Sequence, residues 1–275
     1  MPAAAIALVL LSAVLHATWN ALLKGAEDKE ASAAIIVTGA GSLSAALALA
    51  FGSGGVPRAA LPWAFATGAV EAVYFLTLTA ALARLPLQSA YGISRGCGVL
   101  FVWPIALVFL DEQATWLALF GAAILAFGLF VQMRSLPRSR GLFFALGCAA
   151  AIALYPATYK RAIDTGIAPS ALFALSLAVA LPVQIVGLGR RRGARLRIAL
   201  LGERRWLALA AVCCAASFLI FLHTLKSAGP AHVSAMRNTS VLFAAAWGWA
   251  RGEVFDARSL TSALAITVGA ALVAL

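Results

Sequence analysis

Charged residues are scarce in this chain, and their scarcity argues against a soluble globular protein. Only 11% of the 275 residues are charged, whereas 63% are hydrophobic. Soluble domains contain about 25% charged residues. The apolar residues form runs long enough to cross a hydrocarbon core of about 30 Å, at roughly 20 residues per span. We therefore predict a multi-pass membrane protein with almost no chain left for a domain outside the bilayer.

Motifs for metal-dependent proteolysis and nucleotide hydrolysis are also missing. The chain contains no H-E-x-x-H sequence and no Walker A sequence. Its four cysteines fall inside apolar runs without the spacing of metal ligands: Cys97, Cys148, Cys213 and Cys214. We expect neither an enzyme nor an ATP-driven pump, and no cofactor or metal. The net charge of +11 does not indicate a nucleic-acid partner, because no soluble basic domain accompanies it.

Ten apolar segments of spanning length can be placed along the chain. Glycine and proline punctuate several of the breaks between them, where they interrupt helices. The predicted spans are residues 3–23, 32–52, 61–83, 88–110, 113–133, 141–163, 168–189, 205–226, 230–251 and 256–275. The predicted fold class is therefore an all-α membrane protein with ten transmembrane helices.

Matching residues in the two halves indicate an internal repeat. Ala17-Thr18-Trp19 corresponds to Ala157-Thr158-Tyr159 at an offset of 140 residues. Farther along, Arg95 corresponds to Arg237 at a slightly larger offset. The two halves of the repeat therefore align along much of their length.

The repeat divides the chain into two five-helix halves, residues 1–133 and 141–275, joined by a basic linker at 134–140. Because five is odd, the second half enters the bilayer in the opposite orientation. Two inverted halves can rock about a central site that opens alternately to each side, which is typical of secondary transporters.

Basic residues predict the orientation of the chain. Fifteen lysines and arginines lie in the connections after the odd-numbered spans, and four lie after the even-numbered ones. By the positive-inside rule the first set is cytoplasmic, so both termini lie outside. Seven of the fifteen are in residues 189–205. The apolar Leu196, Ile198, Leu200 and Leu201 would let this segment lie on an anionic leaflet, while a plain topology signal is the simpler interpretation.

Three ionisable residues fall well inside predicted spans: Glu71, Arg95 and Arg237. Such groups are costly in a bilayer and normally face a cavity or a partner. At about 1.5 Å per residue, Arg95 lies about 10 Å from the cytoplasmic end of its helix and Arg237 about 10 Å from the outer end of its own. Glu71 is expected nearer the level of Arg237. Either a Glu71–Arg237 ion pair or a direct role in substrate binding fits these depths.

Polar and aromatic residues accompany these charges at helical spacing. His16 and Asn20 share a helix face, as do Tyr155 and Tyr159. Core packing is the alternative role for these side chains. The predicted substrate-binding residues are His16, Trp19, Asn20, Glu71, Tyr74, Tyr91, Arg95, Tyr155, Tyr159 and Arg237. Glu71 is also the predicted coupling residue, because a carboxyl group can load and release a proton.

The chain resembles the EamA-type transporters of the drug/metabolite transporter superfamily. The likeness rests on His16-Ala17-Thr18-Trp19-Asn20 with Lys24, and on the acidic ends of the fourth and ninth spans, Asp111-Glu112 and Glu253. It implies ten helices in two inverted halves and a transport role. It also implies a cavity lined mainly by the first, third, fourth, sixth, eighth and ninth helices.

The excess of arginine over glutamate within the spans predicts a substrate with an anionic group. A carboxylate or phosphonate, as in an organic acid, an amino acid or an aminophosphonate, can form bidentate hydrogen bonds with a guanidinium. Export of cationic drugs or amines and flipping of a lipid carrier remain alternative functions. The expected partners are this small molecule and the lipid bilayer. The expected location is the bacterial inner membrane, as a monomer or homodimer.

The predicted orientation can be tested with a cysteine placed at Gly193 of a cysteine-free variant. A membrane-impermeant maleimide should leave this cysteine unlabelled in intact cells, because the segment is expected in the cytoplasm. Labelling should appear once the cells are permeabilised. Rapid labelling in intact cells would reverse the assignment.

Overall fold

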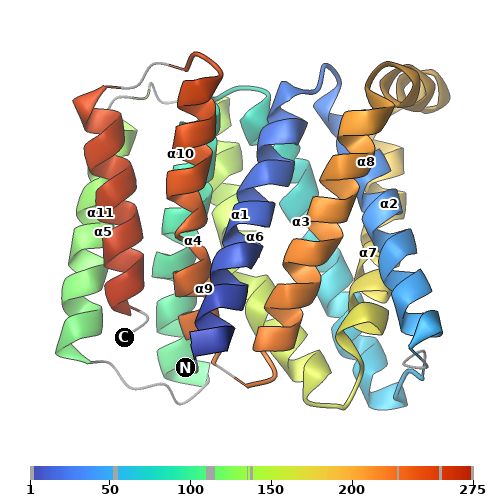
Figure 1. The fold of residues 1–275 in the computed structure, drawn as a ribbon, viewed down its shortest axis with the longest axis horizontal. Coiled ribbons are helices and arrows are strands. Elements are labelled where there is room, and N and C mark those ends of the chain that lie inside the picture. The colour runs from blue at the N-terminus through green and yellow to red at the C-terminus, as the bar shows by residue number, and fades with distance from the viewer. Residues whose placement is uncertain are drawn as a thin grey trace.

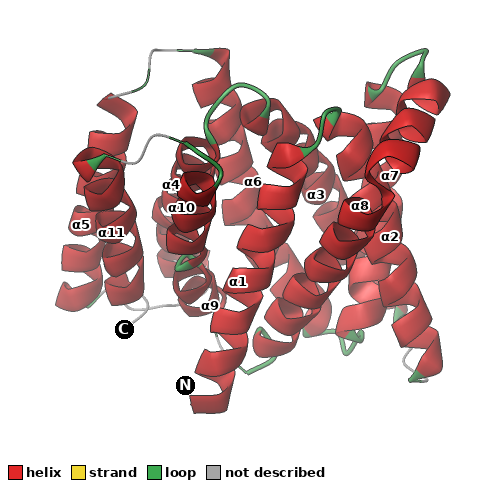
Figure 2. Ribbon diagram, turned by 45° about the horizontal axis from the view of Figure 1, so that its top comes forward, coloured by secondary structure: helices red, strands yellow, loops and turns green. Residues whose placement is uncertain are grey.

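The computed structural model describes residues 3–51, 55–109, 115–134, 136, 139–227, 229–253 and 256–273. Within these ranges the regular structure is entirely helical (Figure 2). The helices are α1 (Ala3–Gly25), α2 (Lys29–Ala50), a 3₁₀ turn η1 (Arg58–Ala60), α3 (Leu61–Leu82), α4 (Leu87–Phe109), α5 (Trp116–Arg134), α6 (Arg140–Ile163), α7 (Pro169–Gly187), α8 (Arg192–Thr224), α9 (Pro230–Arg237), α10 (Ser240–Ala250) and α11 (Ala257–Val273).

The prediction of an all-helical membrane protein is confirmed. In the described part of the chain, seven helices are long and apolar enough to cross a bilayer: α1, α2, α3, α5, α6, α7 and α8. Helix α11 is also apolar, but at 17 residues it is shorter than each of these seven helices. The bundle places both termini at one end and the start of α8 at the other, as the charge distribution predicts (Figure 1).

Two predicted spans differ from the observed helices. The span at 230–251 is divided, because Asn238 and Thr239 form a turn between α9 and α10. The amide of Val241 bonds to the carbonyl of Asn238 at 2.9 Å, which is the i to i+3 pattern of a 3₁₀ turn. The span at 205–226 is the continuation of a longer helix, α8, which leaves helical geometry at Glu203 (φ −126°, ψ 15°).

Local sequence explains several helix ends. The Asp28 carboxylate accepts a hydrogen bond from the Ala31 amide at 3.0 Å and caps α2. Ser139 caps α6 in the same way through the Leu142 amide at 3.4 Å. Proline begins α7 and α9, where its missing N–H breaks no helical bond. Gly189, with φ of +74°, separates α7 from α8 in a conformation that other residues rarely adopt.

Small residues bring α5 and α11 together along one side of the bundle. A Cβ atom on Gly121 would lie 2.7 Å from the carbonyl oxygen of Gly269, and a Cβ atom on Gly269 would lie 2.6 Å from that of Gly121. The two backbones are therefore in direct contact, as in other close-packed membrane helices.

Gly269→Ala should lower the stability of the protein by on the order of 1–3 kcal/mol, because the added methyl group must push two backbones apart. Thermal unfolding of the purified protein in detergent measures the effect. Gly193→Ala is the matched control, since a Cβ atom there meets nothing within 4 Å. Equal melting temperatures for the two variants would contradict the contact.

Candidate functional site

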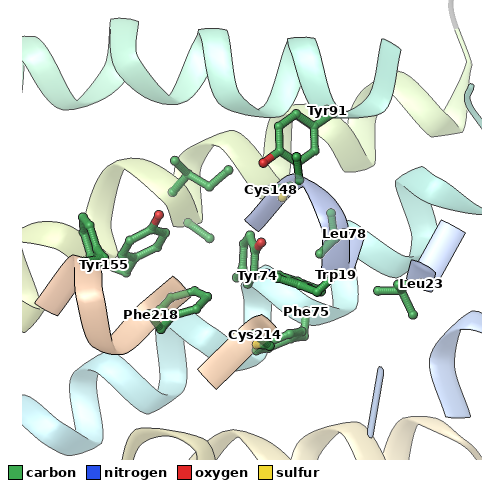
Figure 3. Packing of buried hydrophobic residues seen from close by; sticks show 14 of the residues in the cluster. Trp19, Leu23, Tyr74, Phe75, Leu78, Tyr91, Cys148, Tyr155, Cys214 and Phe218 are labelled. Carbon is green, nitrogen blue, oxygen red and sulfur yellow. The ribbon is translucent and has the colours of Figure 1, made fainter. Parts of the chain in front are cut away.

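The ten predicted site residues are all buried, each with 3% or less of its surface exposed. They come from α1, α3, α4, α6 and α9, and the contacts below connect most of them through the middle of the bundle. Figure 3 shows Trp19, Tyr74, Tyr91 and Tyr155 within the same packed region. The aromatic cluster and the buried charges therefore occupy one place, as the sequence predicts.

The two buried arginines meet at a single tyrosine. Arg95 Nη1 donates to the Tyr155 hydroxyl at 3.5 Å, and Arg237 Nη1 donates to the same oxygen at 3.4 Å. The sequence predicts that the two arginines begin near opposite ends of their helices, yet their guanidinium groups share one hydroxyl oxygen. Because an arginine side chain is long, both guanidinium groups can reach Tyr155 from different helices.

His16 is the closest polar partner of Arg237. Its Nδ1 accepts from Arg237 Nη2 at 2.7 Å and from Trp19 Nε1 at 3.3 Å, so Nδ1 carries no proton. The proton of this neutral imidazole is therefore assigned to Nε2, which lies 3.4 Å from the Tyr74 hydroxyl. The sequence analysis pairs His16 only with Asn20 on one helix face, whereas the structure joins His16 directly to Arg237.

Aromatic rings surround both guanidinium groups. Arg237 Cζ lies 4.8 Å from the ring centre of Phe218 and 4.5 Å from that of Phe221. Arg95 Cζ lies 5.6 Å from the ring centre of Tyr91. Cation–π attraction of this kind is worth about 2 kcal/mol or more when the pair is desolvated. Ring faces and hydroxyl oxygens, rather than carboxylates, therefore stabilise the two charges.

Helix α8 contributes three residues that the sequence analysis missed. Besides Phe218 and Phe221, the Ser217 hydroxyl lies 3.4 Å from Arg237 Nη2 and accepts its hydrogen bond. The i, i+4 spacing of Ser217 and Phe221 is a weak signal, because phenylalanine is common in apolar spans. Only the packing of α8 against α1 identifies these residues as part of the site.

Glu71 does not pair with Arg237, and the ion-pair alternative is wrong. The Tyr159 hydroxyl donates to Glu71 Oε1 at 3.0 Å, which links α3 to α6. The ion pairs among the described residues are at the helix ends: Lys160–Asp164, Arg195–Asp28 and Arg195–Glu30. Arg237 lies instead against α1 and α8, so its guanidinium faces His16 and Ser217.

Several polar atoms in this region have no hydrogen-bond partner. They are Glu71 Oε2, Arg95 Nη2, Arg237 Nε and Asn20 Oδ1. A buried polar atom without a partner is unfavourable by about 1–3 kcal/mol. These atoms can therefore form hydrogen bonds to a bound molecule. The other end of the Asn20 amide donates to the His16 carbonyl oxygen at 2.8 Å.

One stretch of α4 has the pattern of a hydrolase nucleophile without its geometry. Gly92-Ile93-Ser94-Arg95-Gly96 fits G-x-S-x-G, which marks a nucleophile when it forms a sharp turn between a strand and a helix. Here the five residues lie within a continuous helix. The Ser94 hydroxyl donates to the Ala145 carbonyl oxygen at 3.2 Å. It therefore joins α4 to α6 and does not form a nucleophile elbow.

Comparison with known proteins identifies the family. Residues 139–275 match the model of the EamA-like transporter family. On the basis of this match over its second half, the chain belongs to the EamA-like transporter family. A solved structure titled "Crystal structure of protein" is similar over 100% of this chain and 98% of its own, with 18% sequence identity and a TM-score of 0.69. At that identity the likeness shows a shared fold. No curated protein matches the chain.

This EamA-like chain is a multi-pass membrane protein of a transporter family. Two of the charged residues that carry the resemblance have structural roles. Lys24 donates to the carbonyl oxygens of Leu82 and Leu85 at 2.8 and 2.7 Å and caps the end of α3. Glu253 accepts from the Leu87 amide at 2.6 Å at the start of α4. Asp111-Glu112 lies outside the described residues.

The described residues contain no group of three or more histidine, cysteine, aspartate or glutamate side chains that could hold a metal ion. The groups that the described site presents are guanidinium, carboxyl, imidazole, amide and hydroxyl groups and aromatic rings.

Proposed function

We propose that this protein is a secondary transporter that moves a small metabolite with an anionic group across the bacterial inner membrane by alternating access. The observation that carries the proposal is the pair of buried guanidinium groups, which meet at Tyr155 without a carboxylate partner. A bound carboxylate, phosphate or phosphonate would neutralise them through bidentate hydrogen bonds. The partnerless Arg95 Nη2 and Arg237 Nε are two donors available for this purpose.

We further propose that the chain crosses the membrane ten times as two inverted halves, with α9 and α10 together forming the ninth span. The packing of the helices supports this arrangement. A two-fold rotation that exchanges the halves would match α1 with α6, α2 with α7, α3 with α8 and α4 with α10. The helix pair α3 and α6 then corresponds to α8 and α1, the pair α4 and α6 to α10 and α1, and the pair α2 and α8 to α7 and α3. Each of these pairs is in contact. Each arginine then occupies the equivalent position in its own half.

Two grooves on the sides of the bundle bear on the choice between a soluble substrate and a lipid. One groove runs between α2 and α7 along Val37, Gly41 and Leu177, and another runs between α4 and α5 along Leu100 and Leu129. Neither includes a residue of the polar cluster. A flippase needs a lateral path from the bilayer to the headgroup site, whereas a soluble solute enters from either end. Export of a cationic compound is the other alternative, and it would require Glu71 and the rings to bind the ligand.

Arg95→Gln and Arg237→Gln should each weaken the binding of an anionic ligand. Loss of one charged hydrogen-bonding partner reduces binding by about 1.5–3 kcal/mol, or roughly ten- to hundredfold in Kd. A thermal-shift screen of the purified protein against organic acids, amino acids, aminophosphonates and quaternary amines identifies the ligand, since binding to the native state raises apparent stability. Titration of the variants then measures the change in Kd.

Arg84→Gln is the matched control, because Arg84 is exposed at a helix end and its loss removes the same charge. Its affinity should equal that of the unaltered protein. The anionic-substrate proposal fails if both buried-arginine variants bind normally while Glu71→Gln abolishes binding.

Glu71→Gln should remove the dependence of transport on the proton gradient, because an amide cannot take up or release a proton. Tyr159→Phe keeps the carboxyl group and removes its observed hydrogen bond, so coupling should persist with an altered pH profile. Uptake into proteoliposomes at several pH values on each side measures both effects. An unaltered rate and pH dependence in Glu71→Gln would exclude the coupling role.

A further inference from the structure

The first part of α8, residues 192–202, forms a surface helix at the end of the bundle. At Glu203 the backbone departs from helical geometry, and the chain changes direction before the spanning part of α8 begins. Figure 1 shows this surface helix at one corner of the bundle, above α2 and α7, at the end opposite to the chain termini. The sequence analysis predicts that the same residues belong to a connection between two spans.

The inner side of the surface helix is fixed to the bundle. Ala199 is 6% exposed and packs in a small apolar cluster with Ala31, Ala34 and Leu188. Leu196 packs against this cluster from the same side of the helix. The surface helix therefore has a defined orientation on α2 and α7.

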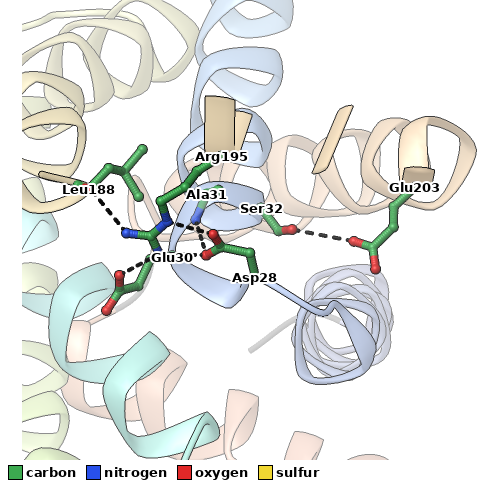
Figure 4. A network of polar contacts seen from close by, with 7 residues as sticks. All are labelled: Asp28, Glu30, Ala31, Ser32, Leu188, Arg195 and Glu203. Carbon is green, nitrogen blue, oxygen red and sulfur yellow. Dashed lines mark hydrogen bonds and ion pairs between the residues drawn. The ribbon is translucent and has the colours of Figure 1, made fainter. Parts of the chain in front are cut away.

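Polar contacts hold the same side in place (Figure 4). Arg195 Nε and Nη2 donate to the two carboxylate oxygens of Asp28 at 2.6 and 2.7 Å, and Nη2 also donates to Glu30 at 2.8 Å. Glu203 accepts from the Glu27 amide at 3.1 Å. The bonds from the Arg195 guanidinium hold the pKa of the Asp28 carboxyl below its ordinary value, so the pair is ionised at neutral pH.

The outer side of the surface helix combines exposed apolar residues with arginines. Ile198 is 68% exposed, Leu201 is 67% exposed, and the two are three positions apart on one helix face. Trp206, at the start of the spanning part, is 63% exposed. Six arginines along and beside the helix are also exposed: Arg190, Arg191, Arg192, Arg197, Arg204 and Arg205.

A topology signal requires the arginines and does not require the apolar residues. In water, exposed Ile198 and Leu201 are unfavourable, because apolar surface is stabilised by removal from solvent. The helix continues at Glu203 into a membrane span, so its outer side lies at the level of the bilayer surface. Interfacial helices combine these features, with apolar side chains at the acyl boundary and basic side chains among the headgroups.

We propose that the surface helix is a binding site for anionic phospholipids of the adjoining leaflet. The exposed arginines bind the headgroup phosphates, and their aliphatic stems reach along the apolar surface. Ile198 and Leu201 contact the upper part of the acyl chains, and Trp206 lies at the headgroup level, which is the usual place of tryptophan in membrane proteins. The hydrogen bonds from Arg195 to Asp28 and Glu30 hold the outer side of the helix towards the lipid in one orientation.

The proximity of anionic lipid to the surface helix tests the proposal. Ile198→Cys, in the full chain with its native cysteines replaced, is labelled with bimane and reconstituted into vesicles of phosphatidylcholine and phosphatidylglycerol in equal parts. A nitroxide is placed on the acyl chains of one lipid or the other. Nitroxide-labelled phosphatidylglycerol should quench bimane more than labelled phosphatidylcholine does, and high salt should reduce the difference.

A variant with five of these arginines replaced by glutamine should be quenched equally by the two lipids. The replaced residues are Arg191, Arg192, Arg197, Arg204 and Arg205. The same substitution at Arg58 and Arg161, exposed at the other end of the bundle, should leave the preference unchanged. Bimane at Phe51, which is exposed at the C-terminal end of α2, should show no preference.

Two results would overturn the proposal. If neither lipid quenches the label at residue 198, the helix does not contact the bilayer, and an acidic protein partner becomes the better candidate for this surface. If both lipids quench equally in the unaltered helix, or if the glutamine variant keeps its preference, the arginines do not select anionic lipid. Because the readout is lipid proximity, failure of the transport proposal would leave the result intact.

Discussion

The convergence of two guanidinium groups at Tyr155 is the constraint on which the centre of the bundle depends. Each charge is removed from water, and like charges close together repel. The structure compensates for this with the hydroxyl group of Tyr155, with a neutral His16 and with the rings of Phe218 and Phe221. These groups accept hydrogen bonds or attract cations without cancelling the charge. Both guanidinium groups are therefore buried without a carboxylate partner among the described residues.

This arrangement requires side chains from both halves of the chain at one point. His16 comes from α1 and Arg95 from α4, while Tyr155 and Arg237 come from α6 and α9. Close packing makes such convergence possible, as the contact between Gly121 and Gly269 shows elsewhere in the bundle. The 3₁₀ turn that follows Arg237 lies beside the same centre, and such turns within helices often mark hinges. Movement of one half against the other would change the contacts of both arginines together.

Charges at the helix ends have a different function from those at the centre. Lys24 and Glu253 cap neighbouring helices, and Arg195 joins the first helix connection to the start of α8. The contacts of Lys24 and Glu253 are favourable because each capping group meets backbone atoms that have no partner within their own helix. They fix the end of the bundle at which the surface helix lies. The resemblance of Lys24 and Glu253 to family residues thus coincides with contacts that join neighbouring helices.

The sequence by itself determined the helical membrane fold, the places of most spans and the residues of the polar centre. Hydrophobic runs decide where helices cross a bilayer, and an ionisable residue within such a run must face inward, so Glu71, Arg95 and Arg237 could be selected without coordinates. Tyr155 and His16 followed from their helical spacing beside other polar and aromatic groups.

The tertiary structure alone decided which of these residues touch. The position of a residue along its helix gives the depth of its Cα atom to within a turn, but a long side chain reaches farther than one turn. The pairing of Arg237 with His16 rather than with Glu71 therefore depends on how α1, α8 and α9 pack. The same holds for Ser217 and Phe221, which are ordinary residues of an apolar helix until α8 faces Arg237. The surface helix could not be assigned from sequence either, because a row of arginines fits a loop as well as a helix. Its structure depends on the packing of Ala199 and the bonds of Arg195 to residues more than 160 positions away.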